Sequence, residues 1–172
     1  MNIRVLIGIA RKTLELLPKF GWVALLLTRL FVGYFFLETG WGKLHNLDGF
    51  AMRFAQWGIP HPAFNAALSA YTEFIGGALT IAGLGTRLVS IPMIINMIVA
   101  IVAVNIKSVS SLNDFVELDE PLYALSFLWL FFFGPGFVSM DAFVKSIFDS
   151  FADSRQDYER RLPSEATANA NP

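Results

Sequence analysis

The sequence predicts an all-α membrane protein: a bundle of four transmembrane helices with amphipathic N- and C-terminal helices at the membrane interface. The first observation is composition. Hydrophobic residues make up 55% of the 172-residue chain and charged residues 16%, whereas a soluble domain carries about 25% charged residues. The second observation is that the apolar residues gather into stretches close to the ~20 residues that a helix needs to cross a ~30 Å hydrocarbon core. The stretches are Phe20–Thr39, Phe64–Leu84, Leu88–Ile106 and Leu122–Phe137.

Residues 1–19 form the first predicted element, an amphipathic helix that lies on the membrane surface. Apolar side chains recur there at helical spacing, with Arg4, Arg11 and Lys12 set among them. A frayed tail is the alternative. Pro18 is expected to break this helix before the first span, because proline lacks the amide that a helix needs.

Residues 20–137 form the predicted membrane domain. Between its first two spans, the segment 42–62 is too polar to cross and is interrupted by Gly58, Pro60 and Pro62. We therefore expect this segment to lie at the membrane surface or to fold back over the bundle.

The second span is rich in small residues, including Ala78 and Ala82, and small residues allow helices to approach closely in lipid. The short turn 83–87 predicts a tight antiparallel hairpin between the second and third spans. An acidic loop, 107–120, follows the third span, and Pro121 is a favourable first-turn residue for the fourth.

The C-terminal part divides into a helix and a tail. Ser139 is placed to cap a helix, and Asp141 favours the positive end of that helix. Residues 138–153 are therefore predicted to form an interfacial helix. Residues 154–172 are polar and are expected to be disordered.

Lys and Arg residues are distributed unevenly between the two sides of the predicted bundle. Nine lie before the first span, in the 83–87 turn and after the fourth span, whereas the opposite loops hold three, Lys43, Arg53 and Lys107. Cytoplasmic loops carry the excess of Lys and Arg. We therefore expect both termini to be cytoplasmic and the 107–120 loop to lie outside.

The composition also excludes several kinds of function. The chain has no cysteine, which excludes disulfides and iron–sulfur ligation, and its two histidines, His45 and His61, lie outside the predicted spans. Two-histidine haem binding is therefore not expected, and no Glu and His arrangement has metal-ligand spacing. The net charge of −1 gives no sign of nucleic-acid binding. Any redox role would need a diffusible cofactor or a partner subunit.

Charged and polar residues inside the spans are the main site candidates, because a charge at membrane depth costs at least ~2.5 kcal/mol. Arg29 and Glu73 each lie about nine residues into their spans, or ~14 Å deep, and Asn96 falls in the same layer. We expect Arg29 and Glu73 to meet near the bilayer midplane. Such a polar cluster would bind a polar head group, for example a quinone carbonyl, or relay a proton. The alternative is a structural ion pair that fixes helix register.

One face of the first span carries a stripe of glycines and cations. Lys43, at its end, would bind an anionic group or extend toward phospholipid head groups. We expect Arg29, Lys43 and Glu73 to line one cavity that opens toward the outer half of the bilayer. The residues that share the face are Arg29, Gly33, Phe36, Gly40 and Lys43.

Glu38 and His45 are secondary candidates, seven residues apart along one stripe of the same helix. As a pair they would carry protons, and the alternative is two polar residues that face the surface. His61, between two prolines, is interpreted as an ordinary loop residue.

Five short motifs occur in an order and spacing that resemble the DoxX family of bacterial membrane proteins. They are RLFVG from Arg29, GWGKL from Gly40, EFIGG from Glu73, GLGTR from Gly83 and GPGFVSMD from Gly134, and the resemblance covers about Leu25 to Ala142. It implies a small four-helix membrane bundle in the bacterial inner membrane. Some members are described as subunits of quinone-linked oxidoreductases, including a thiosulfate–quinone system, and others belong to membrane redox assemblies that handle oxidative stress.

The resemblance therefore implies an accessory component of a quinone-linked membrane redox assembly. At most it would be an oxidoreductase subunit without a redox centre of its own, with quinone as a non-covalent ligand. One alternative is a non-enzymatic scaffold or assembly factor for a soluble partner, and another is a protein that binds a small lipophile or lets it permeate. The expected partners are the bilayer, soluble or membrane redox proteins, and further copies of this chain.

Overall fold

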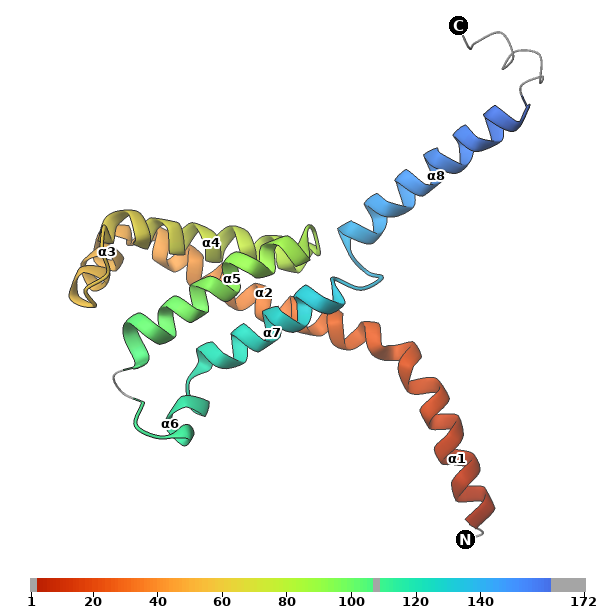
Figure 1. The fold of residues 1–172 in the computed structure, drawn as a ribbon, viewed down its shortest axis with the longest axis horizontal. Coiled ribbons are helices and arrows are strands. Elements are labelled where there is room, and N and C mark those ends of the chain that lie inside the picture. The colour runs from red at the N-terminus through yellow and green to blue at the C-terminus, as the bar shows by residue number, and fades with distance from the viewer. Residues whose placement is uncertain (1–2, 107–108, 162–172) are drawn as a thin grey trace, which may run out of the picture.

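The structure is a computed structural model that describes residues 3–106 and 109–161, and all regular elements in these ranges are helical (Figure 1). The elements are α1 (Ile3–Leu16), η1 (Leu17–Phe20), α2 (Gly21–His45), α3 (Leu47–Gln56), α4 (Pro62–Ala82), α5 (Thr86–Ala100), η2 (Ile101–Asn105), α6 (Leu112–Val116), α7 (Asp119–Phe133) and α8 (Met140–Arg161).

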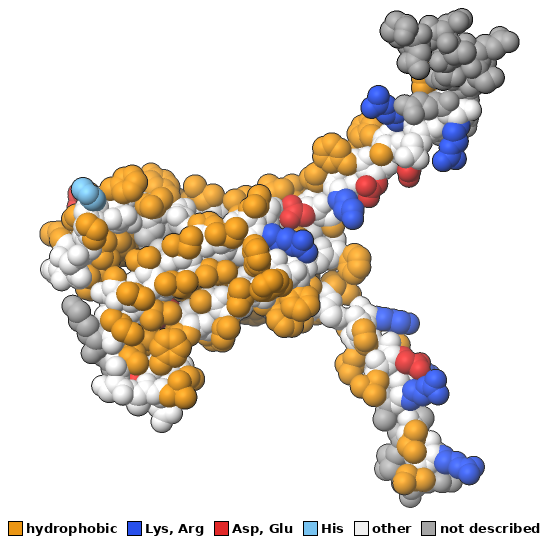
Figure 2. All heavy atoms as spheres, in the orientation of Figure 1, with side chains coloured by type: hydrophobic (Ala, Val, Ile, Leu, Met, Phe, Trp, Pro, Cys, Tyr) orange, Lys and Arg blue, Asp and Glu red, His pale blue; other side chains and the backbone are white. Residues whose placement is uncertain are grey.

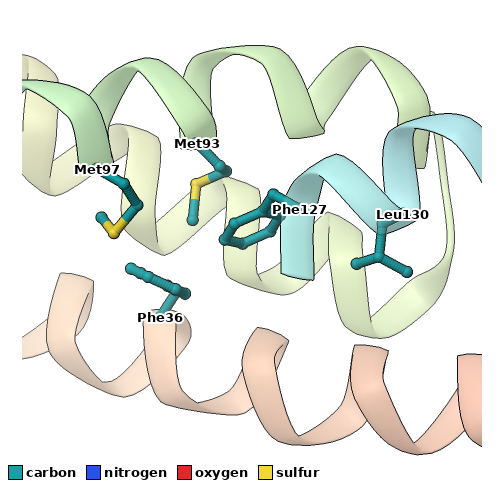
Figure 3. Packing of buried hydrophobic residues seen from close by; sticks show 5 residues of the cluster. All are labelled: Phe36, Met93, Met97, Phe127 and Leu130. Atoms are coloured by element: carbon teal, nitrogen blue, oxygen red, sulfur yellow. The ribbon is translucent and has the colours of Figure 1, made fainter. Parts of the chain in front are cut away.

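Four helices, α2, α4, α5 and α7, pack against one another and form the body of the molecule. Its largest apolar cluster lies between α2, α5 and α7 and is fully buried (Figure 3). The cluster consists of Phe36, Met93, Met97, Phe127 and Leu130. The predicted all-α architecture is therefore confirmed.

The prediction of four membrane-spanning helices is not confirmed, and the length and composition of the helices support it for two of them. In the described part of the chain, Leu14–His45 and Thr86–Asn105 are long and apolar enough to cross a bilayer. Helix α7 has 15 residues, or ~22 Å at helical rise, which is shorter than the hydrocarbon core. Helix α4 has 21 residues, but its sequence includes Ser69, Thr72 and the charged Glu73.

Glycines bring α2 and α4 into direct backbone contact. A Cβ built on Gly33 would lie 3.0 Å from the carbonyl oxygen of Gly77, and one on Gly77 would lie 2.9 Å from the Cα of Leu37. This close packing agrees with the small residues of the second span. The residues responsible are different from those expected, because Ala78 and Ala82 are exposed.

The predicted hairpin and the predicted fold-back of the 42–62 segment are also present. Helix α4 ends at Ala82 and α5 begins at Thr86, with Gly83 and Gly85 at positive φ values of 67° and 58° in the turn. Helix α3 folds back onto α4, where Phe50 and Phe54 pack against small residues of α4, as the sequence suggested for the 42–62 segment.

Both terminal helices project from the same end of the body (Figure 1). The predicted break at Pro18 is confirmed, because α1 ends at Leu16 and a short 3₁₀ turn leads into α2. Ser139 caps α8 as expected, with its Oγ accepting a hydrogen bond from the amide of Ala142 at 3.1 Å.

Helix α8 is longer than the predicted 138–153 helix and continues to Arg161. The expected disorder is therefore wrong for residues 154–161, and residues 162–172 lie outside the described part. The prediction rested on polar composition, which a solvent-exposed helix shares with a disordered segment.

The acidic loop after the third span contains the short helix α6. Ser111 and Asp114 form a capping box at its start. The amides of Ser110 and Ser111 donate to the Asp114 carboxylate, and these bonds hold its pKa below the ordinary value. Lys107, the first residue of the predicted loop, lies outside the described residues.

Candidate functional site

Arg29 is fully buried, with 1% of its surface exposed, and it binds backbone carbonyls rather than a carboxylate. Its Nε donates to Thr80 at 3.0 Å and Nη2 to Ile81 at 2.8 Å. Nη1 donates to Pro135 and Val138, both at 2.7 Å. The first two carbonyls belong to the last turn of α4, where carbonyls lack helical partners and the helix dipole is negative. Arg29 therefore joins the end of α4 to the loop between α7 and α8.

The expected Arg29–Glu73 pair is wrong. Gly40 packs so closely on α4 that an added Cβ would lie 2.7 Å from the Cα of Phe74. This contact brings the neighbouring Glu73 to the level of Thr39, whose hydroxyl lies 3.2 Å from Oε2 of Glu73. Thr39 follows Arg29 by ten residues, or ~15 Å along α2. The two charges therefore lie at different levels of the body.

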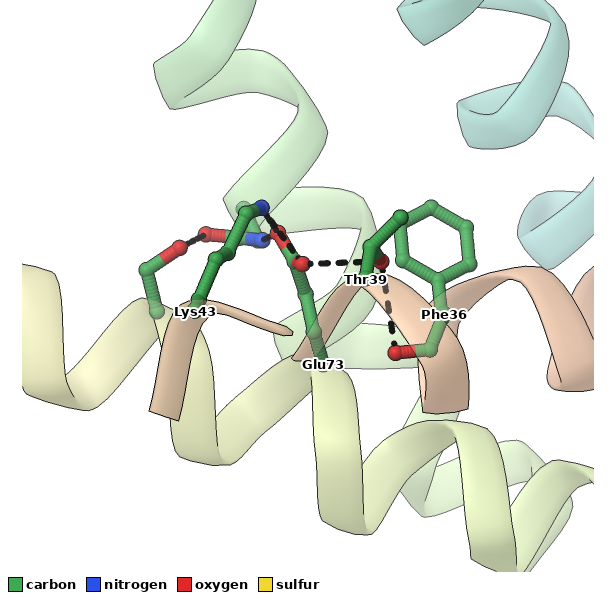
Figure 4. Close-up of polar contacts among 6 residues, drawn as sticks. Phe36, Thr39, Lys43 and Glu73 are labelled. Atoms are coloured by element: carbon green, nitrogen blue, oxygen red, sulfur yellow. Dashed lines mark hydrogen bonds and ion pairs between the residues drawn. The ribbon is translucent and has the colours of Figure 1, made fainter. Parts of the chain in front are cut away.

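Glu73 instead pairs with Lys43 (Figure 4). Asn96 joins these two residues in a polar cluster. Both carboxylate oxygens lie 2.5 Å from Nζ of Lys43. Nδ2 of Asn96 donates to Oε1 at 2.9 Å, and Oδ1 of Asn96 accepts from the Ser69 hydroxyl at 2.9 Å. The cluster therefore connects α2, α4 and α5.

Burial differs between the two members of the ion pair. The Glu73 side chain is 3% exposed and that of Lys43 is 29% exposed. The ammonium of Lys43 lies 5.0 Å from the centre of the Phe50 ring, and the guanidinium carbon of Arg53 lies 5.7 Å from the same ring. These are cation–π distances, so α3 covers the pair with an aromatic surface.

A cavity of about 320 Å³ adjoins the polar cluster. Lys43, Glu73 and Asn96 line it, whereas Arg29 does not. The expectation that Arg29, Lys43 and Glu73 line one cavity is therefore wrong for Arg29. Arg53 and Glu120 also contribute charges to its wall, Ser69 and Asn105 add polar groups, and apolar side chains form the rest. The described lining therefore holds two cations and two carboxylates.

An apolar hollow of about 450 Å³ adjoins this cavity and shares part of its wall. Ser69 and Asn96 are among the shared residues, while Leu68, Pro92 and Ile95 line the outer part. A ligand with a polar head and an apolar tail would match the two volumes together.

The helical turn at the cavity is widened. After Ala100, the chain forms a π-helical segment, η2, and its residues Val104 and Asn105 line the cavity. Single π turns within α-helices occur frequently at functional sites. No motif in the sequence predicts this widening.

The secondary candidates are not brought together with the cluster. Glu38 is exposed on α2. His45 is exposed, its Nδ1 lies 2.9 Å from the carbonyl oxygen of Trp41, and its ring packs on Trp41. His61 is exposed and starts α4 with a positive φ of 47°. In the described ranges, no three His, Asp or Glu side chains gather as a metal site.

Several residues of the site were not predicted from the sequence, among them Thr39, Ser69, Arg53 and Glu120. Two of them carried a signal. Thr39 precedes Lys43 by four residues and Ser69 precedes Glu73 by four, which places each on the same helix face as the charged residue. Arg53 and Glu120 come from other elements, so only the tertiary structure brings them to the cavity.

These features define the class of the protein: it is an all-α protein with two helices of bilayer length and a polar cluster beside a cavity. The family model DoxX matches residues 24–106. "Putative oxidoreductase CatD" of Bacillus subtilis is 33% identical over 122 residues, which cover 71% of this chain and 87% of that protein. "Uncharacterized membrane protein Rv3486" of Mycobacterium tuberculosis is 35% identical over 95 residues, 55% of this chain and 58% of that protein.

No solved structure matches the chain. The chain belongs to the DoxX family and is a membrane protein, which confirms the resemblance seen in its motifs. The family model ends at residue 106. The last of the five motifs, at 134–141, therefore lies outside its match.

Proposed function

We propose that this protein binds the head group of a quinone or a similar lipophile in the cavity beside Glu73, as an accessory component of a quinone-linked redox assembly. The observation that carries the proposal is the polar cluster, in which Lys43 and Asn96 place hydrogen-bond donors at the wall of a cavity that is also lined by aromatic and aliphatic side chains. A quinone carbonyl accepts hydrogen bonds, and the adjoining apolar hollow would hold the start of its tail. The printed name of the B. subtilis relative, an oxidoreductase, supports the redox context.

The proposal assigns different roles to the three polar residues. Asn96 would donate to a head-group carbonyl, Lys43 would provide positive charge near its second oxygen, and Glu73 would hold both donors in place. Electrons would come from a redox partner protein, because the residues named here supply binding and proton transfer alone.

The experiment measures quenching of tryptophan fluorescence by decylubiquinone, using the full chain in mild detergent. Trp57 lines the cavity, so a bound quinone would lie close to it. The variant Asn96→Ala should weaken binding about tenfold, the usual effect of losing one hydrogen bond of ~1.4 kcal/mol. Asn113→Ala, at an exposed position of α6, is the matched control and should bind like the wild type. Equal affinities for the two variants would contradict the proposal.

A scaffold for a soluble partner is the second candidate. Helix α8 favours it, because its 22 residues project from the body and carry exposed aromatic side chains such as Phe143 and Phe151 (Figure 1). Absence of quinone from the protein purified from its native membrane, together with a stoichiometric soluble partner lost on deleting α8, would favour this function.

A further inference from the structure

A separate hollow lies at the other end of the body, where η1, the α4–α5 turn and the α7–α8 loop come together. Its volume is about 750 Å³, and none of the residues of the Glu73 cluster line it. It is formed on one side by Trp22 and Leu25 of α2 and on the other by the loop from Gly134 to Ser139. It is therefore independent of the proposed quinone site.

The charges around this hollow are mostly positive. Arg87 and Lys145 line it, and in the described part of the chain neither forms an ion pair. Arg87 donates a long hydrogen bond of 3.4 Å to Phe132, which leaves its other donors available. The one carboxylate in the described lining is Asp141, and it already accepts from the amide of Gly85 at 2.8 Å.

Arg29 adds a third positive charge behind the wall. Its guanidinium donates to the carbonyl of Pro135, which lines the hollow, and among the described residues it forms no salt bridge, although it interacts electrostatically with the Asp141 carboxylate. Three cations therefore surround one carboxylate, and the site favours a ligand with negative charge.

The remainder of the wall is apolar and suits acyl chains. Trp22, Leu88 and Phe133 line it, and tryptophan is enriched at membrane–water interfaces. Figure 2 shows that the Lys and Arg side chains visible on this face gather at this end of the body and along α1 and α8. A basic pocket at the end of membrane helices is a setting in which anionic lipid head groups bind.

We propose that this hollow binds an anionic phospholipid. Its phosphate would lie between Arg87 and Lys145, and its acyl chains would run over Trp22, Leu88 and Phe133. Guanidinium groups bind phosphate oxygens through two parallel hydrogen bonds, which suits Arg87 to the phosphate.

The test is native mass spectrometry of the full chain in mild detergent, with equal amounts of dioleoylphosphatidylglycerol and dioleoylphosphatidylcholine. These lipids share their acyl chains and differ in net charge. We expect a preference for phosphatidylglycerol of at least tenfold, since each nearby cation contributes about fivefold. The double variant Arg87→Gln, Lys145→Gln should bind the two lipids about equally, because the Asp141 carboxylate offsets the charge of the remaining Arg29. The matched control Arg4→Gln, Lys12→Gln removes two exposed cations of α1 and should keep the preference.

Two outcomes would overturn the proposal: a preference that survives the Arg87, Lys145 double variant, or one that falls equally in the control. Inorganic phosphate at millimolar concentration should not displace the lipid, and displacement would instead indicate a site for the free anion. A second readout needs no cation variant. Phosphatidylglycerol with brominated acyl chains should quench the wild-type tryptophan fluorescence more than that of Trp22→Phe, and equal quenching would contradict the site.

Discussion

Arg29 and Lys43 lie on one face of α2, and each binds a different kind of partner. Arg29 binds four backbone carbonyls near the end of α4 and in the α7–α8 loop, whereas Lys43 pairs with the Glu73 carboxylate. The planar guanidinium of arginine holds its five donors in a fixed geometry, so it can bind several carbonyls at once. The lysine ammonium is a compact charge at the end of a flexible side chain. Arg29 therefore stabilises the fold, and Lys43 and Glu73 remain the candidates for ligand binding.

Arg29→Gln should lower the free energy of unfolding by more than about 3 kcal/mol, because hydrogen bonds from charged groups contribute ~1.5–3 kcal/mol each. The free energy of unfolding of Arg29→Lys should lie between that of Arg29→Gln and that of the wild type. Denaturant unfolding in detergent micelles measures both. The folded fraction should bind decylubiquinone like the wild type, since Arg29 does not line the cavity. A weakened quinone affinity of the folded protein would contradict the structural role.

A double-mutant cycle with Lys43→Gln and Glu73→Gln should give a coupling free energy of about 1–3 kcal/mol. This is less than the full cost of breaking a buried pair, because Lys43 is 29% exposed. The matched cycle between Arg29→Gln and Glu73→Gln should be additive within ~0.5 kcal/mol, as expected for residues without shared partners. Unfolding free energies of the single and double variants provide the measurement, and the reverse ranking of the two cycles would show that the pairing is wrong.

The contact between α2 and α4 sets the position of the site at the scale of elements. Gly40 lies against the backbone of Phe74, which brings Glu73 within reach of Lys43 and Thr39. Helix α3 then covers the pair, and the π segment η2 completes the cavity wall. The site is therefore a product of helix register rather than of one motif.

Gly40→Ala should destabilise the protein by about 1–3 kcal/mol, because the new methyl group would overlap the backbone of α4. Gly42→Ala is the matched control on the same helix, since nothing lies within 4 Å of a Cβ at that position. Its stability should be unchanged or slightly higher, as alanine favours a helix by up to ~1 kcal/mol over glycine. Thermal unfolding in detergent compares them, and equal losses would argue against the observed α2–α4 contact.

The whole molecule has two different ends. Helices α3 and α6 lie at one end, and α1 and α8 lie at the other (Figure 1). The residues that line the cavity beside Glu73 belong to the first end, and those that line the basic hollow belong to the second. We propose that α2, α4, α5 and α7 all cross the inner membrane, with both termini in the cytoplasm and the Glu73 cavity toward the outer side. The uneven distribution of Lys and Arg supports this orientation.

The absence of native cysteine makes this topology directly measurable. A membrane-impermeant maleimide should label Asn113→Cys in intact cells, and it should label Ser154→Cys only after the membrane is opened. Both positions are exposed, on α6 and α8 respectively. Labelling of Ser154→Cys alone in intact cells would show that the orientation is the reverse of the proposed one. Labelling of both variants would contradict a membrane between the two ends.

The sequence by itself determined the four long helices of the body, the turn between α4 and α5 and the buried face of α2. Hydrophobic stretches, prolines and glycines act locally, so the break at Pro18, the tight α4–α5 hairpin and the stripe of Arg29, Gly33, Phe36 and Gly40 followed from the chain alone. The membrane class and family followed as well. Polarity near residue 154 was less informative, because an exposed helix and a disordered tail have similar compositions.

Only the tertiary structure decided which charges meet. Helical periodicity gives the face of a residue but not the axial offset between two helices, and an error of a few residues moves a charge by several ångströms. The backbone contact at Gly40 set that offset and paired Glu73 with Lys43, while Arg29 reached the carbonyls at the other end of α4. Arg53, Glu120 and the widened turn at Asn105 come together from separate elements, so the cavity exists only in the folded chain.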